Sequence, residues 1–278
     1  MNGTSSPSDD RILIEISGGI ADVRLNRPDK LNALDPGMFE ALVDAGERLA
    51  RTTGLRAVVI SGAGRGFCAG LDKDTFASMA SGRRDPAISD LKTRTHGIAN
   101  APQQAALVWR DLPVPVIAAI HGVALGGGFQ IALGADIRYV APDARLSILE
   151  VKWGLVPDMG GIALMRELAR GDIIRELTMT GRIFSGLEAH AYGFATAVHA
   201  DPFVAAQATA REIAGRSPEA VRAIKRLLNR SSDDDSATIL LAESAEQQAL
   251  VGSPNQIEAI KSAVENRPAN FADGRLSR

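Results

Sequence analysis

The segment from Pro115 to Gly161 constrains the fold most, because it joins an apolar run, consecutive glycines and an apolar helical pattern. The apolar run, 116–119, suits a buried strand. The glycines, 126–128, precede a helical pattern that begins at Phe129. Where a strand enters a helix through glycines, the first backbone N–H groups of the helix stay free, and with the helix dipole they form a site for negative charge.

Two carboxylates follow these glycines. Glu150 lies in the same segment, and Asp158 lies in a Gly/Pro-rich turn after it. One fixed anion site with one or two acids is the minimum equipment for moving a proton next to a carbonyl group. Close helix packing explains the glycines alone equally well. The sequence has no G-K-[ST] after a glycine loop, no G-x-G-x-x-G before a helix and no G-x-S-x-G, which argues against phosphate loops and serine hydrolases.

The bulk properties exclude several classes of protein. The formal net charge of −2 gives no reason to expect nucleic acid or a membrane surface as a partner. A single cysteine, Cys68, excludes an internal disulfide and fits a reducing cytosol, so we expect a cytoplasmic location. No apolar run is long enough for a transmembrane helix. The four histidines show no metal-ligand spacing, and residues 1–10 have the composition of a disordered leader.

The first part of the chain predicts an α/β fold. Residues 12–25 alternate apolar and polar around Gly18-Gly19, which predicts a hairpin. Asp35 and Pro36 predict the start of a helix, as N-cap and first residue. Residues 57–61 predict a buried strand, and the glycine-rich loop that follows it lies where ligands bind in α/β sheets.

Residues 73–112 are the least readable part, and they are interpreted either as a lid over the glycine loop or as a plain pair of surface helices. Further on, Ser185 and Glu188 have capping-box spacing. We expect the remaining elements as follows: helices at 74–80 and 89–112 around a mobile break at 81–86, strands at 137–141 and 145–149, helices at 162–170 and 173–179, a last strand at 195–200, and helices at 201–215, 217–229, 236–251 and 255–266.

Several motifs in this order resemble the crotonase superfamily, the enoyl-CoA hydratase/isomerase family. The resemblance covers roughly residues 12–271. Its carriers are NRPDKLNAL (26–34), SGAGRGFCAGLD (61–72), PVIAAIHGVALGGGFQIALGADIRY (115–139), EVKWGLVPDMGG (150–161), LTMTGRIFSGLEAHAYGFATAV (177–198) and ENRPANF (265–271).

This resemblance implies an α/β fold, a crotonase (ClpP-like) spiral of ββα units with C-terminal oligomerisation helices. The spiral core is expected at 11–215 and the helical trimerisation region at 216–278. The implied partners are an acyl-CoA thioester substrate and further copies of the chain, as a trimer or a dimer of trimers. Coenzyme A is then part of the substrate, and no separate cofactor is expected.

The resemblance also implies which backbone groups bind the substrate. The N–H groups of Leu71 and Gly127 correspond to the pair that binds the thioester oxygen. The expected substrate-binding residues around this pair are Lys30, Leu31, Ala69, Asp72 and Gly126. A contact between Lys30 and a phosphate of coenzyme A is one reading, and a merely solvated lysine is the other.

The acids depart from the pattern of a family hydratase, which has two glutamates. Glu150 matches the second, but Gln130 stands at the first, and an amide cannot take or give a proton. Asp158 has the spacing of an aspartate that joins the proton transfers in dienoyl-CoA isomerases, or it only starts the helix near Gly161. We therefore favour double-bond isomerisation, with Glu150 as the acid/base.

Other functions stay open at this point. Hydration of 2-enoyl-CoA in fatty-acid β-oxidation is the first alternative, another reaction of a CoA ester is a second, and an acyl-CoA-binding member without catalysis is a third. Gln130 is either an inert replacement or a residue that orients water. Cys68 is interpreted as a small buried residue, and His121, placed on the strand before the glycines, as a core or oligomer-contact histidine.

Overall fold

The computed structural model describes residues 11–81 and 90–273. The leader predicted at 1–10 and most of the break predicted at 81–86 lie outside these residues. In the described part, no helix is both long and apolar enough to cross a bilayer.

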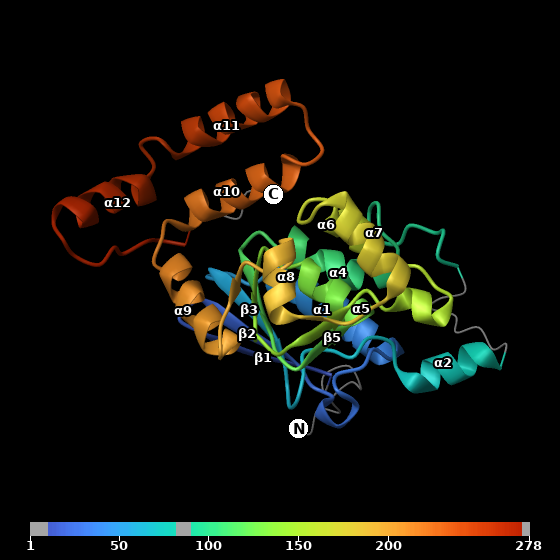
Figure 1. Ribbon diagram of the computed structural model, residues 1–278. Coiled ribbons are helices and arrows are strands. Elements are labelled where there is room, and N and C mark those ends of the chain that lie inside the picture. Colours follow the sequence, from blue (N-terminus) through green and yellow to red (C-terminus); the bar gives the residue numbers. More distant parts are fainter. Residues whose placement is uncertain (1–10, 82–89, 274–278) are drawn as a thin grey trace, which may run out of the picture.

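Two β-sheets form the centre of the molecule (Figure 1). In the described residues the larger sheet has the order β1-β2-β3-β4-β6-β9 and is parallel except for the β1–β2 hairpin, and the smaller has the order β5-β7-β8. The strands are β1 (Ile12–Ser17), β2 (Ile20–Leu25), β3 (Ala57–Gly62), β4 (Val116–Ile120), β5 (Val123–Leu125), β6 (Ile137–Val140), β7 (Arg145–Ser147), β8 (Phe184–Ser185) and β9 (Ala197–Val198).

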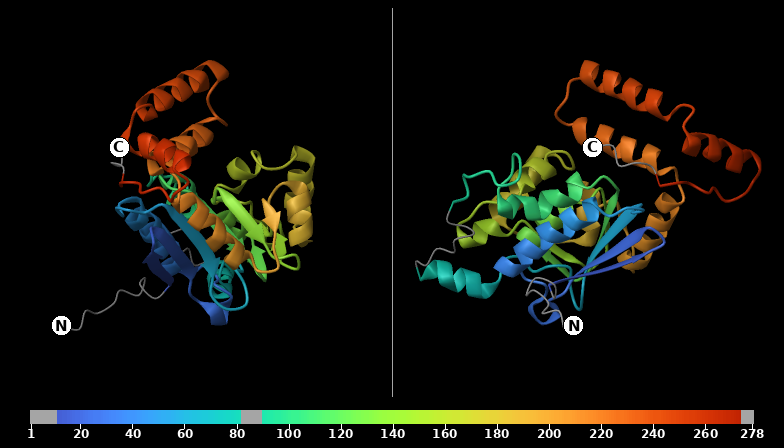
Figure 2. Two further views of the ribbon diagram at one scale, coloured as in Figure 1. Left: turned by 90° about the vertical axis from the view of Figure 1, so that its left-hand side faces the viewer. Right: turned by 180° about the vertical axis from the view of Figure 1, so that it is seen from behind.

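Helices surround both sheets, and those at the C-terminal end of the chain leave the body (Figure 2). They are α1 (Pro36–Ala50), α2 (Lys73–Ala80), α4 (Ala101–Asp111), α5 (Gly127–Leu133), α6 (Gly161–Met165), α7 (Gly171–Thr180), α8 (Gly186–Tyr192), α9 (Pro202–Ala214), α10 (Pro218–Arg230), α11 (Ser236–Leu250) and α12 (Pro254–Val264), with the 3₁₀ helices η1 (Pro28–Lys30) and η2 (Glu150–Trp153).

Elements with strong local signals form where the sequence predicts them. The hairpin pairs Ile12 with Leu25. The Asp35 side chain accepts a hydrogen bond from the N–H of Met38, 2.9 Å away, and so caps α1. Ser185 and its partner three residues later form the predicted capping box of α8. These predictions are confirmed because each depends on neighbours within a few residues.

The strand before the glycines is not the one predicted. The apolar run forms β4, but the chain then turns at His121 and Gly122 and starts β5, which pairs with β7 in the smaller sheet. Gly122 has φ of 62°, and an added Cβ would lie 2.0 Å from the carbonyl oxygen of Arg65. The chain bends tightly against the 62–66 loop, so the placement of His121 on a strand was wrong.

The helix predicted at 89–112 is shorter in the structure. Residues 90–100 form turns, and α4 begins only at Ala101. The Asn100 side chain accepts a hydrogen bond from Gln103 N–H, and the Gln103 side chain accepts one from Asn100 N–H. Pro102 lies in the first turn of α4, where its missing N–H costs no intrahelical hydrogen bond.

The main apolar core lies between the sheets and their covering helices. It contains an edge-to-face aromatic group, in which the Phe129 ring lies 5.6 Å from Phe184 and 5.5 Å from Phe194. Small residues pack on the other face of the larger sheet, where Ala206 and Ala210 of α9 contact β3 and β4. Aromatic rings thus contribute to the main core, although only 4% of the residues in the chain are aromatic.

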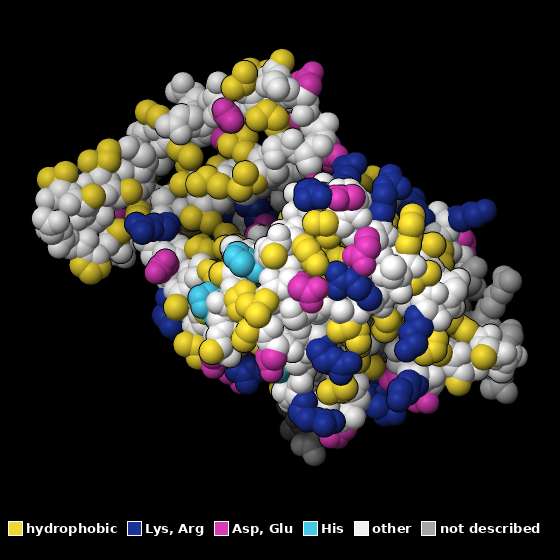
Figure 3. Space-filling view, in the orientation of Figure 1, with side chains coloured by type: hydrophobic (Ala, Val, Ile, Leu, Met, Phe, Trp, Pro, Cys, Tyr) yellow, Lys and Arg dark blue, Asp and Glu magenta, His cyan; other side chains and the backbone are white. Residues whose placement is uncertain are grey.

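The C-terminal helices α10–α12 project from the body (Figures 1 and 2). Lys225 anchors α10: its Nζ donates to the carbonyl of Val114 (3.0 Å) and pairs with Asp136 (2.7 Å). Beyond this anchor, α11 buries none of its residues, and Leu240 and Leu241 are 61% and 73% exposed. Apolar side chains are visible along these helices in Figure 3.

Candidate active site

The start of α5 forms one wall of the candidate site. Gly126 connects β5 to α5 and has φ of 51°. An added Cβ at this position would lie 3.2 Å from Oε1 of Glu150. At Gly127 an added Cβ would lie 2.8 Å from side-chain atoms of Leu34 and Met159. Glycine is therefore required at 126 both by the left-handed backbone and by the closeness of Glu150.

The backbone at Leu71 forms the facing wall. Leu34 N–H donates to Gly70 O (2.8 Å), and Asp72 N–H donates to Leu34 O (2.9 Å). Since successive N–H groups of an extended chain point to opposite sides, the N–H of Leu71 points away from Leu34. An added Cβ at Gly70 would lie 3.6 Å from Gly127 N, so the two segments are in contact.

The N–H groups of Leu71 and Gly127 are both left available. Within residues 11–81 and 90–273 neither donates to a protein acceptor. Gly127 is the first residue of α5, so the helix itself offers no acceptor to its N–H. Two free donors from adjacent segments are the arrangement that stabilises an oxyanion.

Glu150 begins η2 and is only 9% exposed. Its Oε1 accepts a hydrogen bond of 2.6 Å from Nε2 of Gln130, whereas its Oε2 is buried without a partner in the described residues. Burial raises the pKa of the Glu150 carboxyl, and the negative charge of Asp158 adds to this, while the hydrogen bond from Gln130 opposes it. The result is a carboxylate that is more basic than usual and has one unengaged oxygen.

Gln130 is held in one orientation. Its Oε1 accepts hydrogen bonds from the backbone N–H groups of Met159 (2.9 Å) and Gly161 (3.0 Å). Because both partners are donors, the carbonyl end of the amide must face them, and the NH₂ end must face Glu150. The side chain is 1% exposed. Gln130 therefore connects α5, the 158–161 turn and Glu150.

Asp158 lies in that turn, close enough for its charge to raise the pKa of Glu150. Its side chain keeps contact with solvent, but the protein around it partly desolvates the carboxyl and raises its own pKa. The helix α6 begins at Gly161 with Gly160 as N-cap and no side-chain cap. Gln130 accepts the N–H of Gly161, so Asp158 provides no capping hydrogen bond to this helix start.

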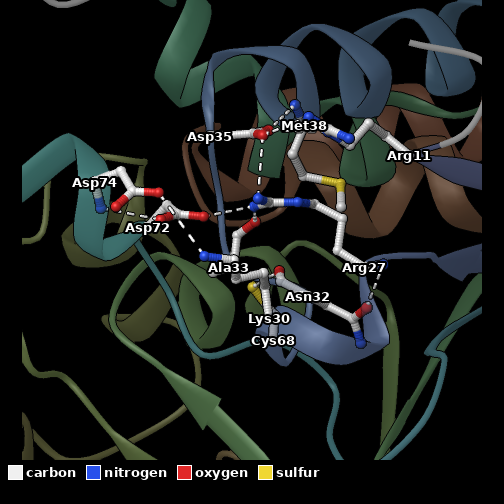
Figure 4. A network of polar contacts seen from close by, with 10 residues as sticks. All are labelled: Arg11, Arg27, Lys30, Asn32, Ala33, Asp35, Met38, Cys68, Asp72 and Asp74. Carbon is white, nitrogen blue, oxygen red and sulfur yellow. Dashed lines mark hydrogen bonds and ion pairs between the residues drawn. The ribbon is translucent and has the colours of Figure 1, made fainter. Parts of the chain in front are cut away.

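The expected substrate-binding residues divide into two groups. Lys30, Leu31 and Ala69 lie together at the surface end of the site, where the N–H of Ala69 donates to Leu31 O (2.9 Å) and the Lys30 ammonium lies 3.8 Å from the Asp74 carboxylate. The Asp72 side chain is instead buried, paired with Arg27 at 2.8 Å, and caps α2 (Figure 4). Only its backbone adjoins the site.

Cys68 and His121 do not belong to the reactive groups. The Cys68 thiol is fully buried and donates to the carbonyl of Asn32 at 3.0 Å, and burial raises its pKa to about 12. A thiol that stays protonated is a poor nucleophile. The His121 ring lies 3.0 Å from the carbonyl of Gly64. Among the described residues, no three His, Cys, Asp or Glu side chains are placed to hold a metal ion.

Two features of the site were missed from the sequence. The tether from Gln130 to the 158–161 turn had no local signal, since its partners lie 29 and 31 residues away. The ion pair between Arg27 and Asp72 joins two segments that were interpreted separately.

A separate hollow of about 560 Å³ lies beside β1, β2 and α9 and is lined by Glu15, Asp22 and Arg211 among others. It contains none of the expected site residues.

Comparisons with known proteins identify the family of the chain. Residues 15–274 match the family model described as enoyl-CoA hydratase/isomerase. The chain is 33% identical over 249 residues to the mitochondrial Delta(3,5)-Delta(2,4)-dienoyl-CoA isomerase of Pongo abelii, covering 88% of this chain and 76% of that protein. It is 31% identical to the mitochondrial methylglutaconyl-CoA hydratase of Mus musculus (94% and 82% covered) and 32% identical to the 1,2-epoxyphenylacetyl-CoA isomerase of Escherichia coli K12 (94% and 97% covered).

Solved structures give the same result. The crystal structure of enoyl-CoA hydratase from Mycobacterium tuberculosis H37Rv superposes with a TM-score of 0.83 at 28% identity, covering 96% of this chain and 100% of that one. The enoyl-CoA hydratase of Bacillus anthracis gives 0.83 at 26% identity, covering 95% and 100%. Since both the family model and the relatives span most of its length, the chain is an enzyme of the enoyl-CoA hydratase/isomerase family, within the crotonase superfamily.

Proposed function

We propose that this enzyme moves a double bond in an acyl-CoA thioester, with Glu150 as the acid/base and the N–H groups of Leu71 and Gly127 as the oxyanion hole. The observation that carries the proposal is the state of Glu150: Gln130 holds one carboxylate oxygen, and the other is buried and unengaged in the described residues. Where a hydratase of the family has a second glutamate, this chain has an amide that donates to Glu150 and cannot exchange a proton.

Isomerisation needs only one base at this position. In a 3-enoyl thioester, Oε2 of Glu150 removes a proton from C2, and the electron pair of that C–H bond moves into a dienolate. The thioester oxygen gains negative charge, which the two backbone N–H groups stabilise. Glu150 then returns the proton to C4, leaving the double bond between C2 and C3. No co-reactant is consumed, and coenzyme A enters only as part of the substrate.

Asp158 extends this chemistry to longer conjugated substrates. Its raised pKa and its electrostatic effect on Glu150 suit a second proton-transfer group near the same acyl chain. In a 3,5-dienoyl ester, Glu150 would act at C2 and Asp158 would protonate the far end of the conjugated system. The relative named as a dienoyl-CoA isomerase supports this assignment.

Hydration of a 2-enoyl ester is the second candidate. The relative named as methylglutaconyl-CoA hydratase favours it. Glu150 and Asp158 would then hold the attacking water between them. We rank it second because Gln130 removes the carboxylate that would share this water with Glu150.

Binding of the substrate and assembly complete the proposal. Lys30, Leu31, Ala69 and Gly126 line the path of the coenzyme A moiety up to the thioester. The exposed apolar side chains of α11 and α12 pack against other copies of the chain, in a trimer or a dimer of trimers. The single cysteine fits a reducing compartment, so we infer a cytoplasmic location.

Incubation with 2-enoyl-, 3-enoyl- and 3,5-dienoyl-CoA esters in deuterated water tests this function. We expect 3-enoyl and 3,5-dienoyl esters to be converted, with deuterium at C4 of the first product and at C6 of the second, to the extent that the protonated carboxyl group exchanges with solvent before it acts. Addition of water to 2-enoyl-CoA should be slower at matched chain length. Faster hydration than isomerisation would overturn the proposal in favour of the second candidate.

A further inference from the structure

The guanidinium of Arg27 contacts both Ala33 and Asp72, which lie on two separate segments of the chain (Figure 4). Its Nη1 donates to the carbonyl oxygen of Ala33 (2.6 Å) and to Oδ2 of Asp72 (2.8 Å). The Arg27 side chain is only 14% exposed, and that of Asp72 is 4% exposed. Such a fork is rigid and buried, which makes it suited to fixing the relative position of two segments.

These contacts enclose the bridge between Leu34 and Leu71. Ala33 precedes Leu34 on one segment, and Asp72 follows Leu71 on the other. Arg27 therefore holds both segments immediately beside the peptide that carries the Leu71 N–H. The direction of that N–H depends on the bridge, because Gly70 O and Asp72 N both bond to Leu34. Loss of the Arg27 contacts would release both segments beside this bridge, and with them the peptide that carries the Leu71 N–H.

The backbone of Arg27 is itself fixed. Its N–H donates to Oδ1 of Asn32 (2.8 Å), and Nδ2 of Asn32 donates to the carbonyls of Ala63 (2.9 Å) and Gly66 (2.8 Å). Asn32 is fully buried and has φ of 56°, a backbone conformation that asparagine tolerates better than most residues. The turn that carries Arg27 is thus anchored on the same glycine loop that it supports.

Asp72 is ionised and has a second bond. Burial raises its pKa, but the hydrogen bonds from Asp74 N–H (3.0 Å) and from Arg27 lower it by more, so that the pKa lies below its usual value. The carboxylate therefore links the oxyanion segment to the first turn of α2. Arg27 also lies 3.4 Å from Asp35, which is paired in turn with Arg11 at 2.6 Å. The Arg11–Asp35 pair belongs to the same cluster but contacts α1 and not the Leu71 strand.

We propose that Arg27 and Asp72 are positioning residues for catalysis, whose ion pair aims the Leu71 N–H at the thioester oxygen. Neither side chain touches the substrate. This inference rests on the proposed oxyanion hole and adds to it the side chains that set its geometry. It predicts that breaking the pair weakens stabilisation of the enolate while leaving binding of coenzyme A in place.

The test compares Arg27→Gln and Asp72→Asn with wild type and with Arg11→Gln as the matched control. Because a misplaced donor loses most of its effect, we expect kcat to fall on the order of 10²-fold in Arg27→Gln, with KM within about threefold. Asp72→Asn keeps a neutral acceptor for Arg27 and for Asp74 N–H, so its loss should be smaller. The double variant Arg27→Gln/Asp72→Asn should be no worse than Arg27→Gln alone, since both act through one contact. Arg11→Gln should retain wild-type kcat.

A spectroscopic readout separates positioning from simple loss of structure. A bound 2,4-dienoyl-CoA ester absorbs at longer wavelength when its thioester oxygen is polarised, and we expect this red shift to shrink in Arg27→Gln and Asp72→Asn. If Arg27→Gln does not fold, Asp72→Asn carries the test. If a folded variant keeps both the red shift and the kcat of wild type, the positioning role of Arg27 and Asp72 is refuted, but the proposed oxyanion hole is not. Absence of any shift in wild type would instead refute the proposed oxyanion hole.

Discussion

Replacement of Gln130 by Glu tests the central electrostatic feature of the site. In the variant, one carboxylate oxygen would keep the hydrogen bonds from Met159 and Gly161, and the other would face Oε1 of Glu150, where the present donor lies 2.6 Å away. Two carboxylates at this distance cannot both be ionised without a large cost, so the pair would share one proton.

The size of the effect follows from Coulomb's law. With charge centres about 4 Å apart and an effective dielectric constant of about 20, the repulsion is about 4 kcal/mol. This corresponds to a rise of roughly three pKa units for the group that keeps the proton. The backbone donors of Met159 and Gly161 favour the ionised form at position 130, so the proton should stay on Glu150.

The assay measures isomerisation of a 3-enoyl ester and hydration of a 2-enoyl ester across the pH range. The acid limb is the pH range over which the isomerisation rate falls as the solution becomes more acidic. In Gln130→Glu we expect this limb to move up by about two to three pH units, because Glu150 must lose its proton to act as the base. Hydration should rise on the order of 10²-fold, since a second carboxyl group becomes available to water.

The control is Gln130→Met, which removes the hydrogen bonds without adding a charge. It should lower isomerisation without increasing hydration, and it should move the acid limb upward by less than Gln130→Glu does, because it removes a donor that lowers the pKa of Glu150 but adds no charge. If the acid limb of Gln130→Glu stays within about half a pH unit of wild type and hydration does not increase, the reasoning about this pair is refuted.

Three further predictions concern the same chain. Glu150→Gln should lower turnover at least about 10³-fold, while calorimetry still detects binding of a CoA ester. Because burial raises the pKa of Glu150 in the folded state, the ionised carboxylate destabilises the fold at pH values above the unfolded-state pKa. The melting temperature of the variant should therefore exceed that of wild type at neutral pH, and the difference should vanish below about pH 4. In wild type, the raised pKa places the acid limb of kcat/KM above the ordinary glutamate value of about 4.3, and a limb at or below that value would contradict it. Leu241→Glu should shift sedimentation toward smaller species, whereas Glu243→Gln on the same exposed helix should not, and a wild-type monomer would disprove the predicted assembly.

The sequence predicted those parts of the fold whose signals are local. Asp35 with Pro36 and Ser185 with Glu188 specify helix starts through contacts between residues that are three positions apart. The uninterrupted apolar residues 57–61 specify a buried strand. In each case the side chains that determine the element lie within it or next to it.

The errors arose where a distant segment determines the local conformation. The turn at Gly122 exists because the 62–66 loop lies against it, and no period in the sequence reports that contact. The start of α4 was missed for another reason: its capping box between Asn100 and Gln103 is local, but the residues before it look helical by composition. Local patterns gave the candidate acids, but only the fold brings Arg27 to Asp72 across 45 positions.

The identity of residue 130 follows from what its three partners require. Two backbone N–H groups need an acceptor, and ionised Glu150 is stabilised by a donor. An amide supplies both at every pH, whereas a carboxyl group supplies both only while it is protonated. Glutamine therefore keeps the turn closed and Glu150 oriented during a proton transfer, when the charge of Glu150 itself changes. A glutamate at this position would couple its own titration to that step, which suits a reaction that activates water but interferes with a base that must take up and return the same proton.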